Sequence, residues 1–380
     1  MDFGLTEEQQ MIRDAARDFA EKELVPNAAH WDQAREFPES AVKQLGELGF
    51  LGMMVDPQWD GSGMDSISYA LAVEEISKGC ASTGVIMSVN NSLVCHPIEE
   101  FGTEAQKERF LKPLASGKKL GAYCLTEPMA GSDAGATKTT AVPDGDDWIV
   151  NGTKIFVTNG AYADTFIVYT ATEPEKKTRG ITGFVIELEQ AGVSVGTREK
   201  TMGIRASCTS EIIFEDVRVT AEHMLGELNR GFKVAMVTLN GGRIGIAAQA
   251  VGIAQAAFEK SVEYAKTRIQ FDVPIASFQA IQWKIAEMAT KIDASRLLVH
   301  EAAHLKDMGA DYSAAAAKAK LLASRTAVEV CDEAIQIHGG YGYVEEYHVE
   351  RHFRDSKITE IYEGTSEIQK LVIARGVLKD

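Results

Sequence analysis

The chain has 380 residues, of which 45% are hydrophobic and 25% are charged, as in an ordinary globular protein. A single hydrophobic core seldom grows to this length, so two or three domains are expected. The formal net charge of −16 argues against nucleic acid as a partner, because the phosphate backbone would be repelled.

The first eight residues are acidic and contain neither an arginine-rich presequence nor an apolar segment. We therefore expect a cytoplasmic protein without a signal or transit peptide, either prokaryotic or a processed mature form. No apolar run is long enough to cross a bilayer, so no membrane span is expected. The odd number of scattered cysteines, without a CxxC pair, argues against a disulfide or zinc framework: Cys80, Cys95, Cys124, Cys208 and Cys331.

Residues 1–120 are predicted to form an N-terminal α-helical domain. Capping boxes at 6–9 and 103–106 mark two helix starts, and apolar residues follow the first at helical spacing. A further helix is expected over 67–78. The nearly apolar segment 82–93 is expected to be buried.

The composition changes at residue 121, and 121–227 are predicted to form a middle β-domain, a barrel or sandwich. The pair Asn151-Gly152 predicts a hairpin turn between strands at 148–150 and 154–157. Further strands are expected at 165–169, 183–186 and 212–214.

Residues 228–380 are predicted to form an antiparallel four-helix bundle, which makes the fold class α+β and multidomain. Glycines within 241–245 are expected to interrupt the first helix, and we interpret them as exposed sites of close packing or ligand approach. The bundle is assembled from the ranges 231–264, 278–305 and 312–337 and a last helix after Gly364.

A short zinc-like motif lies in the second of these helices. His300 and His304 match HExxH, which places two imidazoles on one helix face. No convincing third ligand follows, and coincidence in an amphipathic helix is the better interpretation. No metal is expected.

A lone carboxylate lies between an aromatic residue and a glycine near the end of the chain, at Tyr362-Glu363-Gly364. Glycine lets another molecule approach closely, so Glu363 could serve as a general base. Thr365 or Ser366 can cap the helix that follows. The plainer alternative is that Glu363 only supplies negative charge at a helix start.

Two loops of the β-domain carry small polar groups. The segment 126–133 could bind a ring edge or a phosphate, or could be an ordinary Pro/Gly turn. In a strand, Phe156 and Thr158 would point to the same face, which suits a planar heterocycle. The same pattern also suits a strand with Phe156 in the core.

Two features of the bundle could bind phosphate. The segment 336–342 ends a long helix with three glycines, which either admit a phosphate or form a tight C-terminal turn. Arg268 closes the first long helix, where it could grip a pyrophosphate or simply complement the helix dipole.

Taken in order, these motifs, with Arg351, Arg354 and Asp355, resemble those of the acyl-CoA dehydrogenases over essentially the whole chain. The short-chain, butyryl-CoA type is the most similar. The resemblance implies an FAD enzyme that converts an acyl-CoA thioester to a trans-2-enoyl-CoA and passes electrons to an electron-transferring flavoprotein. Alternatives are the same chemistry on a branched or alicyclic (cyclohexane- or cyclohexene-carboxyl) acyl-CoA, an acyl-CoA oxidase, and a non-enzymatic acyl-CoA-binding scaffold.

The resemblance also implies roles for individual residues. Glu363 takes the α-proton while flavin N5 accepts the β-hydride, and burial beside the acyl chain is expected to raise the pKa of Glu363. Acyl-CoA contacts are expected at Ser132, Asn240, Gly241, Gly242, Arg243, Tyr362 and Gly364.

The FAD contacts implied by the resemblance fall into three groups. Around the flavin they are Tyr123, Leu125, Thr126, Gly131, Ser132, Phe156, Val157 and Thr158. On the adenine-nucleotide side they are Thr365, Ser366 and Glu367. Reaching the FAD of a neighbouring subunit are Arg268, Phe271, Gln279, Gln336, Ile337, His338, Gly339 and Gly340, which implies a homo-oligomer, expected to be a tetramer built as a dimer of dimers.

Three residues depart from the family pattern. Asn240 stands where relatives often have Asp, Asp272 where they usually have Gly, and Met129 where they have a small residue. Isovaleryl- and long-chain-type relatives place their base near position 242. Gly242 cannot abstract a proton, so the resemblance leaves Glu363 as the base.

Overall fold

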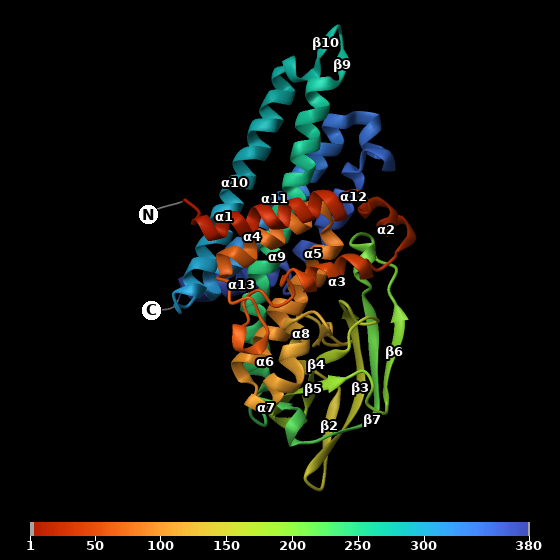
Figure 1. The fold of residues 1–380 in the computed structure, drawn as a ribbon, viewed down its shortest axis with the longest axis vertical. Helices are drawn as coiled ribbons and strands as arrows, with labels where there is room; N and C mark the ends of the chain where they lie inside the picture. The colour runs from red at the N-terminus through yellow and green to blue at the C-terminus, as the bar shows by residue number, and fades with distance from the viewer. Residues whose placement is uncertain (1–3, 379–380) are drawn as a thin grey trace.

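The computed structural model describes residues 4–378; the first three residues of the acidic start and residues 379–380 lie outside them. Helices from the two ends of the chain pack together in the middle of the molecule, with a β-sheet at one end and a helical projection at the other (Figure 1). The predicted three-part architecture of helical, β and helical domains is confirmed.

The N-terminal part is helical, and both predicted capping boxes are present, at Thr6 and at Thr103. The apolar segment 82–93 is buried throughout, first as an α-helix and then as the π-helical stretch Val89–Cys95. The α-helices of this part are α1 Glu7–Phe19, α2 Ala28–Ala34, α3 Glu39–Glu47, α4 Ser66–Gly79, α5 Ala81–Ser88, α6 His96–Phe101, α7 Glu104–Gln106 and α8 Lys112–Ala115.

The middle part is one eight-stranded sheet in the order β6-β7-β3-β2-β4-β5-β8, with β1 parallel to β4. A single residue pair joins β2 to β4, where the sheet turns, and side chains from six strands enclose a core of their own. The strands are β1 Gly121–Cys124, β2 Thr140–Asp144, β3 Asp147–Val157, β4 Thr165–Ala171, β5 Ile181–Glu187, β6 Val193–Arg198, β7 Ser210–Val219 and β8 Met224–Leu225.

Strand β4 is buried on both faces. Phe166 and Val168 point into the core of the sheet, whereas Ile167 and Tyr169 pack into the larger core that the helices share. Alternate side chains of a strand point to opposite faces, so β4 joins the two cores.

The prediction of a hairpin turn at Asn151-Gly152 is wrong. Strand β3 runs continuously through this pair, which forms a bulge against β7, and the turn lies instead at Gly145, between β2 and β3. The Asn151 amide accepts from the Asp216 N–H at 2.8 Å and donates to the Asp216 carboxylate at 3.0 Å. The Asn151-Gly152 pair therefore forms a bulge rather than a turn, because β3 is paired with β2 on one side and β7 on the other.

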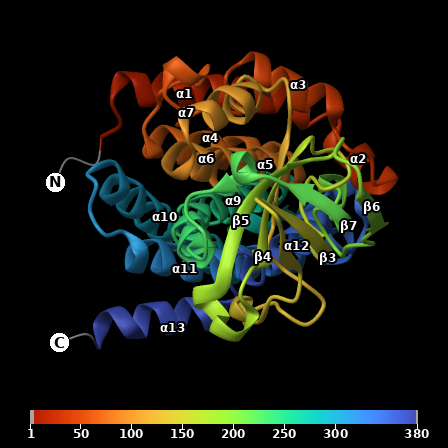
Figure 2. The same ribbon diagram turned by 90° about the horizontal axis from the view of Figure 1, so that it is seen from below.

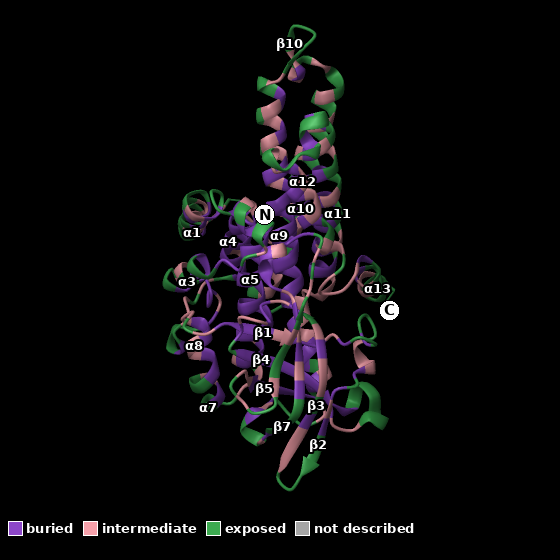
Figure 3. Cartoon of the chain, turned by 90° about the vertical axis from the view of Figure 1, so that its right-hand side faces the viewer, coloured by how far each residue is buried: buried purple, intermediate pink, exposed green. Residues whose placement is uncertain are grey.

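The C-terminal part consists of three long helices and two shorter ones. Helices α9, α10 and α11 pack on one another, and α13 packs on α11, on the side away from the N-terminal helices (Figure 2). Buried residues gather where these helices cross α4 and α5, whereas the projecting ends of α9 and α10 mix exposed, intermediate and buried residues (Figure 3). The elements are α9 Gly231–Thr267, β9 Ile269–Gln270, β10 Val273–Pro274, α10 Gln279–Asp307, α11 Ser313–His338, α12 Val349–Lys357 and α13 Ser366–Val377.

The prediction that glycines interrupt the first long helix is wrong, and these glycines are buried rather than exposed. Helix α9 is continuous through Gly241, Gly242 and Gly245. A Cβ at Gly245 would lie 2.3 Å from the Ser88 hydroxyl and 2.5 Å from the Tyr69 hydroxyl. Close packing, one of the two reasons predicted for these glycines, therefore accounts for Gly245.

No helix within residues 4–378 is both long and apolar enough to cross a membrane. Over the same described residues, no three His, Cys, Asp or Glu side chains gather in a way that could hold a metal ion.

Candidate active site

The turn that carries Glu363 has an unusual backbone. Glu363 has φ 51° and Gly364 has φ 97°, so two consecutive residues adopt the conformation that only glycine tolerates readily. Thr365 then caps α13 by accepting from the Ile368 N–H at 3.4 Å. Glycine is favoured at 364 because residues with a Cβ rarely adopt a φ of 97°.

The carboxylate of Glu363 is buried and has no hydrogen-bond partner within the described chain. Parts of the residue remain accessible, but both carboxylate oxygens are out of contact with solvent. Burial raises the pKa of Glu363 to about 7, against the opposing effects of Lys320 and then Arg243. A base with a pKa near neutrality is well matched to proton abstraction at neutral pH.

Position 242 on α9 faces the same point as the Glu363 carboxylate. A Cβ at Gly242 would lie 2.1 Å from Glu363 Oε2 and 2.7 Å from Leu93 Cδ2. Glycine is therefore required at 242 for a carboxylate from 363 to reach this point.

The residues predicted to contact acyl-CoA on α9 form a short polar chain. Arg243 donates to the Asn240 side-chain oxygen at 2.6 Å, and Asn240 donates to the Ser313 hydroxyl at 3.1 Å. Arg243 is nearly fully buried, and its Nε has no partner within the described residues. Tyr362 donates to the Gln249 side chain.

The two polar segments of the β-domain lie side by side. The Ile155 N–H donates to the Thr126 carbonyl at 2.9 Å, which joins the loop 126–133 to the end of β3. Beneath the loop, the fully buried Lys154 ammonium lies 2.7 Å from Glu127 and 3.2 Å from the Leu125 carbonyl. Glu127 also accepts from Thr137, Lys138 and Thr139, and these contacts fix the loop.

The expectation that Phe156 and Thr158 share one face of a regular strand is wrong. Phe156 has φ 55° in an irregular stretch of β3, and Thr158 lies beyond the strand. Phe156 is 59% exposed, so it does not enter the core. Leu125 and Val157 are buried in hydrophobic cores, so their side chains face away from any ligand in this loop region and only their backbone is available there.

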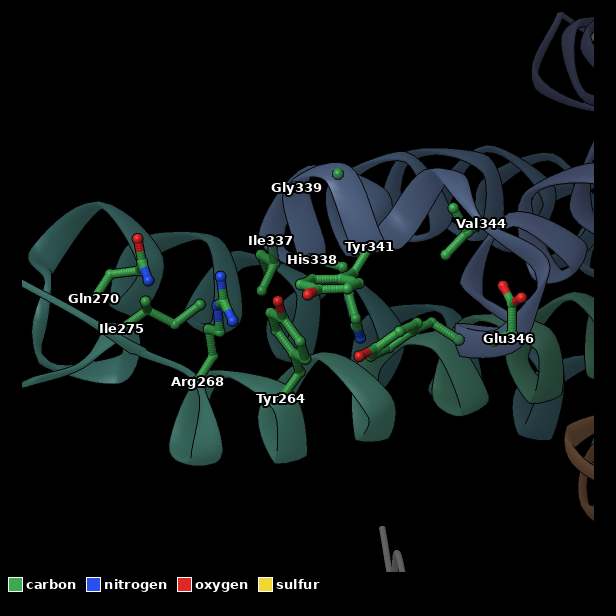
Figure 4. A pocket seen from close by; sticks show the side chains of 12 residues that line it. Tyr264, Arg268, Gln270, Ile275, Ile337, His338, Gly339, Tyr341, Val344 and Glu346 are labelled. Carbon is green, nitrogen blue, oxygen red and sulfur yellow. The ribbon is translucent and has the colours of Figure 1, made fainter.

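A cavity of about 770 Å³ lies at the far end of α9 (Figure 4). Arg268 lies over the Tyr341 ring at 5.2 Å and has no acidic partner within residues 4–378. The stacked rings of Tyr264 and His338, 4.3 Å apart, form one wall. The lining residues are Tyr264, Arg268, Gln270, Ile275, Ile337, His338, Gly339, Gly340, Tyr341, Val344, Glu346 and Tyr347.

The structure therefore brings five of the predicted neighbour-subunit contacts into this cavity, and Gln336 lies beside them by accepting from the Gly339 N–H. Phe271 and Gln279 are exposed outside it, with Phe271 in the β9–β10 turn beside Asp272. An α-helix rises about 1.5 Å per residue, so Arg268 lies roughly 40 Å along α9 from Gly242. The cavity and the Glu363 turn are two separate places on one chain.

The residues present fit an extended nucleotide cofactor such as FAD. A Cβ at Gly131, Gly339 or Gly340 would meet open space, so the backbone is accessible at both places. The exposed ring of Phe156 and the unpaired cation of Arg268 provide a flat surface and a phosphate partner.

Comparison with known proteins identifies the family. The models of the N-terminal, middle and C-terminal domains of acyl-CoA dehydrogenases match residues 6–118, 122–217 and 229–378. The short-chain specific acyl-CoA dehydrogenase of Clostridium acetobutylicum is 50% identical over 379 residues, and the match covers 100% of both chains.

Solved structures agree with that assignment. Butyryl-CoA dehydrogenase from Megasphaera elsdenii matches with a TM-score of 0.98 and 48% identity over the whole of both chains. A chain from the structure of the electron transferring flavoprotein of Acidaminococcus fermentans, described in terms of flavin-based electron bifurcation, matches with a TM-score of 0.99 and 49% identity, again over both whole chains.

The chain belongs to the acyl-CoA dehydrogenase family. It is an oxidoreductase of that type, and the family uses FAD. The predicted likeness to the short-chain, butyryl-CoA type is confirmed.

Three elements of the site were not anticipated from the sequence. Lys320 and Gln369 contact the Glu363 turn, and Lys154 supports the loop 126–133. Lys320 and Lys154 occur in sequence where a solvent-exposed lysine is the ordinary expectation. The sequence feature that points to the Lys154 contact is Glu127, its partner, because Glu127 lies within the Thr126–Asp133 motif.

Proposed function

We propose that this protein dehydrogenates a short-chain acyl-CoA thioester between Cα and Cβ, giving the trans-2-enoyl-CoA, with Glu363 as the base that takes the α-proton. The observation that carries the proposal is the buried Glu363 carboxylate, which has a raised pKa and no partner within the described chain. A buried charge without a partner is costly for a fold, so its retention points to a catalytic role.

The residues around the base suit binding of a thioester. The Glu363 N–H forms no hydrogen bond within residues 4–378 and is free to donate to the thioester oxygen. Such a bond makes the α-proton more acidic, since it stabilises the enolate oxygen that develops as the proton leaves. Glycine at 242 and 364 leaves room for the substrate beside the carboxylate.

FAD, when bound, supplies the hydride acceptor. The loop 126–133 and the exposed Phe156 would hold the flavin, and Thr365, Ser366 and Glu367 lie at the start of α13 on the expected nucleotide side. We assign the Arg268 cavity to the FAD of a second subunit, because it lies so far along α9 from the base. The functional form would then be a homo-oligomer, a tetramer by family pattern.

A short acyl chain is supported by the packing of α9. The hydroxyls of Tyr69 and Ser88, 2.9 Å apart, meet α9 at Gly245, one turn from Gly242. These side chains fill the space beside α9 one turn from Gly242, which leaves little room for a long acyl chain. An electron-transferring flavoprotein is the proposed electron acceptor, in keeping with the Acidaminococcus fermentans relative.

Replacing the base tests its assignment. Glu363→Gln is expected to keep the bound flavin and to bind acyl-CoA, yet to lose nearly all turnover, because an amide cannot accept the α-proton. Turnover with an artificial electron acceptor and binding by flavin absorbance give the two readouts. Retained activity in this variant would rule out Glu363 as the base.

Anaerobic bleaching of the flavin by a panel of saturated acyl-CoAs tests the reaction itself. Straight chains of increasing length, branched chains and cyclohexane-carboxyl-CoA separate the short-chain proposal from the branched and alicyclic alternatives. Rapid reoxidation of the bleached flavin by oxygen would indicate an oxidase instead. Failure of every thioester to bleach the flavin would exclude acyl-CoA dehydrogenation.

A further inference from the structure

The backbone that presents Glu363 is strained and must be held in place. A non-glycine residue with φ near 51° is conformationally strained and persists only where its surroundings fix it. The 3₁₀ turn Ile358–Glu360 precedes the strained pair, and the N-terminus of α13 follows it. Within the described residues, no backbone N–H of either element donates to the carbonyl groups of residues 363 and 364.

Two buried side chains constrain those carbonyl groups. Lys320 donates from Nζ to the Gly364 carbonyl at 2.6 Å, and Gln369 donates to the same oxygen at 2.7 Å. The Gln369 amide also lies 3.4 Å from the Glu363 carbonyl. Both side chains are fully buried, and they come from different helices, α11 and α13. We call Lys320 and Gln369 the carbonyl clamp.

The hydrogen bond from Lys320 to the Gly364 carbonyl does not by itself require a charged donor. Lys320 forms no ion pair within 4.0 Å among the described residues, and an unpaired buried ammonium is costly. Burial lowers the pKa of Lys320 to about 7, and the nearby charge of Glu363 opposes that shift most strongly. A neutral donor would satisfy the carbonyl at lower cost.

We infer that Lys320 and Gln369 are positioning residues: together they hold the strained turn that aims the Glu363 carboxylate, and the Lys320 ammonium stabilises the ionised base. The inference rests on the proposed function of Glu363. Arg243 on α9 acts on both Lys320 and Glu363, whereas Glu360 and Glu367, on either side of the turn, act on Lys320. The titratable groups near Glu363 also include Tyr69, Tyr123 and Tyr362.

Neutral variants of similar shape separate the two roles. Lys320→Met removes both the donor and the charge, and Gln369→Leu removes only a neutral donor. Ser324→Ala, one turn further along α11 at a fully buried position, is the control for general damage to the helix. In anaerobic stopped-flow, both clamp variants should bleach the flavin about 10- to 100-fold more slowly than the wild type, with Ser324→Ala close to it.

The pH dependence identifies the electrostatic part. The rate of bleaching should rise with pH as Glu363 ionises, and Lys320→Met should move the midpoint to higher pH, because the cation that favours the carboxylate is gone. Gln369→Leu should leave the midpoint unchanged. A Lys320→Met protein with an unmoved midpoint would overturn the electrostatic role, and wild-type bleaching rates in both variants would overturn the clamp.

A readout without turnover separates this inference from the proposed function. The infrared band of a protonated carboxyl group that is absent from Glu363→Gln reports the ionisation of Glu363 directly. Its midpoint should also rise in Lys320→Met. If no thioester bleaches the wild-type flavin but this midpoint still rises, the dehydrogenase proposal fails while the effect of Lys320 on Glu363 stands. An unshifted band refutes the effect whatever the activity.

Discussion

The Glu363 carboxylate is buried without a partner, and this has a consequence for stability as well as for catalysis. A carboxyl group whose pKa is raised on folding holds its proton more tightly in the folded state. Its contribution to stability is therefore present below the unfolded pKa and is lost as the pH rises from about 4.5 through about 7.

Glu363→Gln should therefore be more stable than the wild type at alkaline pH. The shift of Glu363 to about 7 corresponds to an upper bound of roughly 3 kcal/mol at pH 8, and the difference should vanish near pH 4. Urea denaturation of both proteins at matched flavin content, measured at the two pH values, checks this. Equal stabilities at pH 8 would mean that the carboxylate is solvated or paired in solution.

At this scale the sequence predicted the proposed base but not the side chains that contact its turn. Glu363 was predictable because it lies in a motif shared with a known family, between an aromatic residue and a glycine. Lys320 lies in an alanine-rich helix, where periodicity does not separate a lysine that points inward from one on the surface. Its partner is a backbone carbonyl 44 residues away, and only the packing of α11 against the turn reveals it.

At the scale of single elements, the bulge in β3 shows how the context of a sheet overrides a turn motif. Gly152 has φ 151°, and a Cβ there would lie 2.5 Å from the Thr139 hydroxyl and 2.7 Å from its Cα. Gly145, in the actual turn, has φ 66° and open space around it. Both positions favour glycine, but for different reasons.

Gly152→Ala should destabilise the protein by about 2 kcal/mol, since the added methyl group meets both backbone strain and Thr139, just before β2. Gly145→Asn is the matched control and should be nearly neutral, because asparagine tolerates positive φ in a turn. Thermal or urea unfolding of the two variants provides the comparison. If the Asn151-Gly152 pair were instead the hairpin turn, Gly145→Asn would be no better tolerated than Gly152→Ala.

Secondary structure itself was largely predictable where patterns are local. The two capping boxes and the helical spacing placed the first helices, since side chain and backbone meet within one turn. The continuity of α9 through its glycines was not predictable, because it depends on close contacts with Ser88, Tyr69 and Glu363. Propensity rules disfavour such a helix, and tertiary packing permits it.

At the scale of the whole molecule, the distance between the Arg268 cavity and the Glu363 turn underlies our proposal that two subunits share each active site. Arg268→Ala alone should weaken flavin retention, and Glu363→Gln alone should be inactive. A hybrid oligomer of the two variants, isolated through two different affinity tags, should regain activity. Its site with an intact Glu363 would receive an intact Arg268 from the other subunit.

The hybrid distinguishes sharing from a site within one chain. If Arg268 served the flavin of its own chain, every site in the hybrid would carry one defect, and activity would not exceed that of the Arg268→Ala parent. Turnover with an artificial acceptor, normalised to flavin, gives the comparison. Equal activity in hybrid and parent would reject the shared site.

The position of strand β4 between the two hydrophobic cores affects how the protein unfolds. Phe166 and Val168 line one core, and Ile167 and Tyr169 line the other, so β4 forms a wall of both. Neither core can be exposed to water by local opening without stripping a wall from its neighbour. Although the sequence divides into three domains, we expect the sheet and the helices beside it to unfold as one cooperative unit.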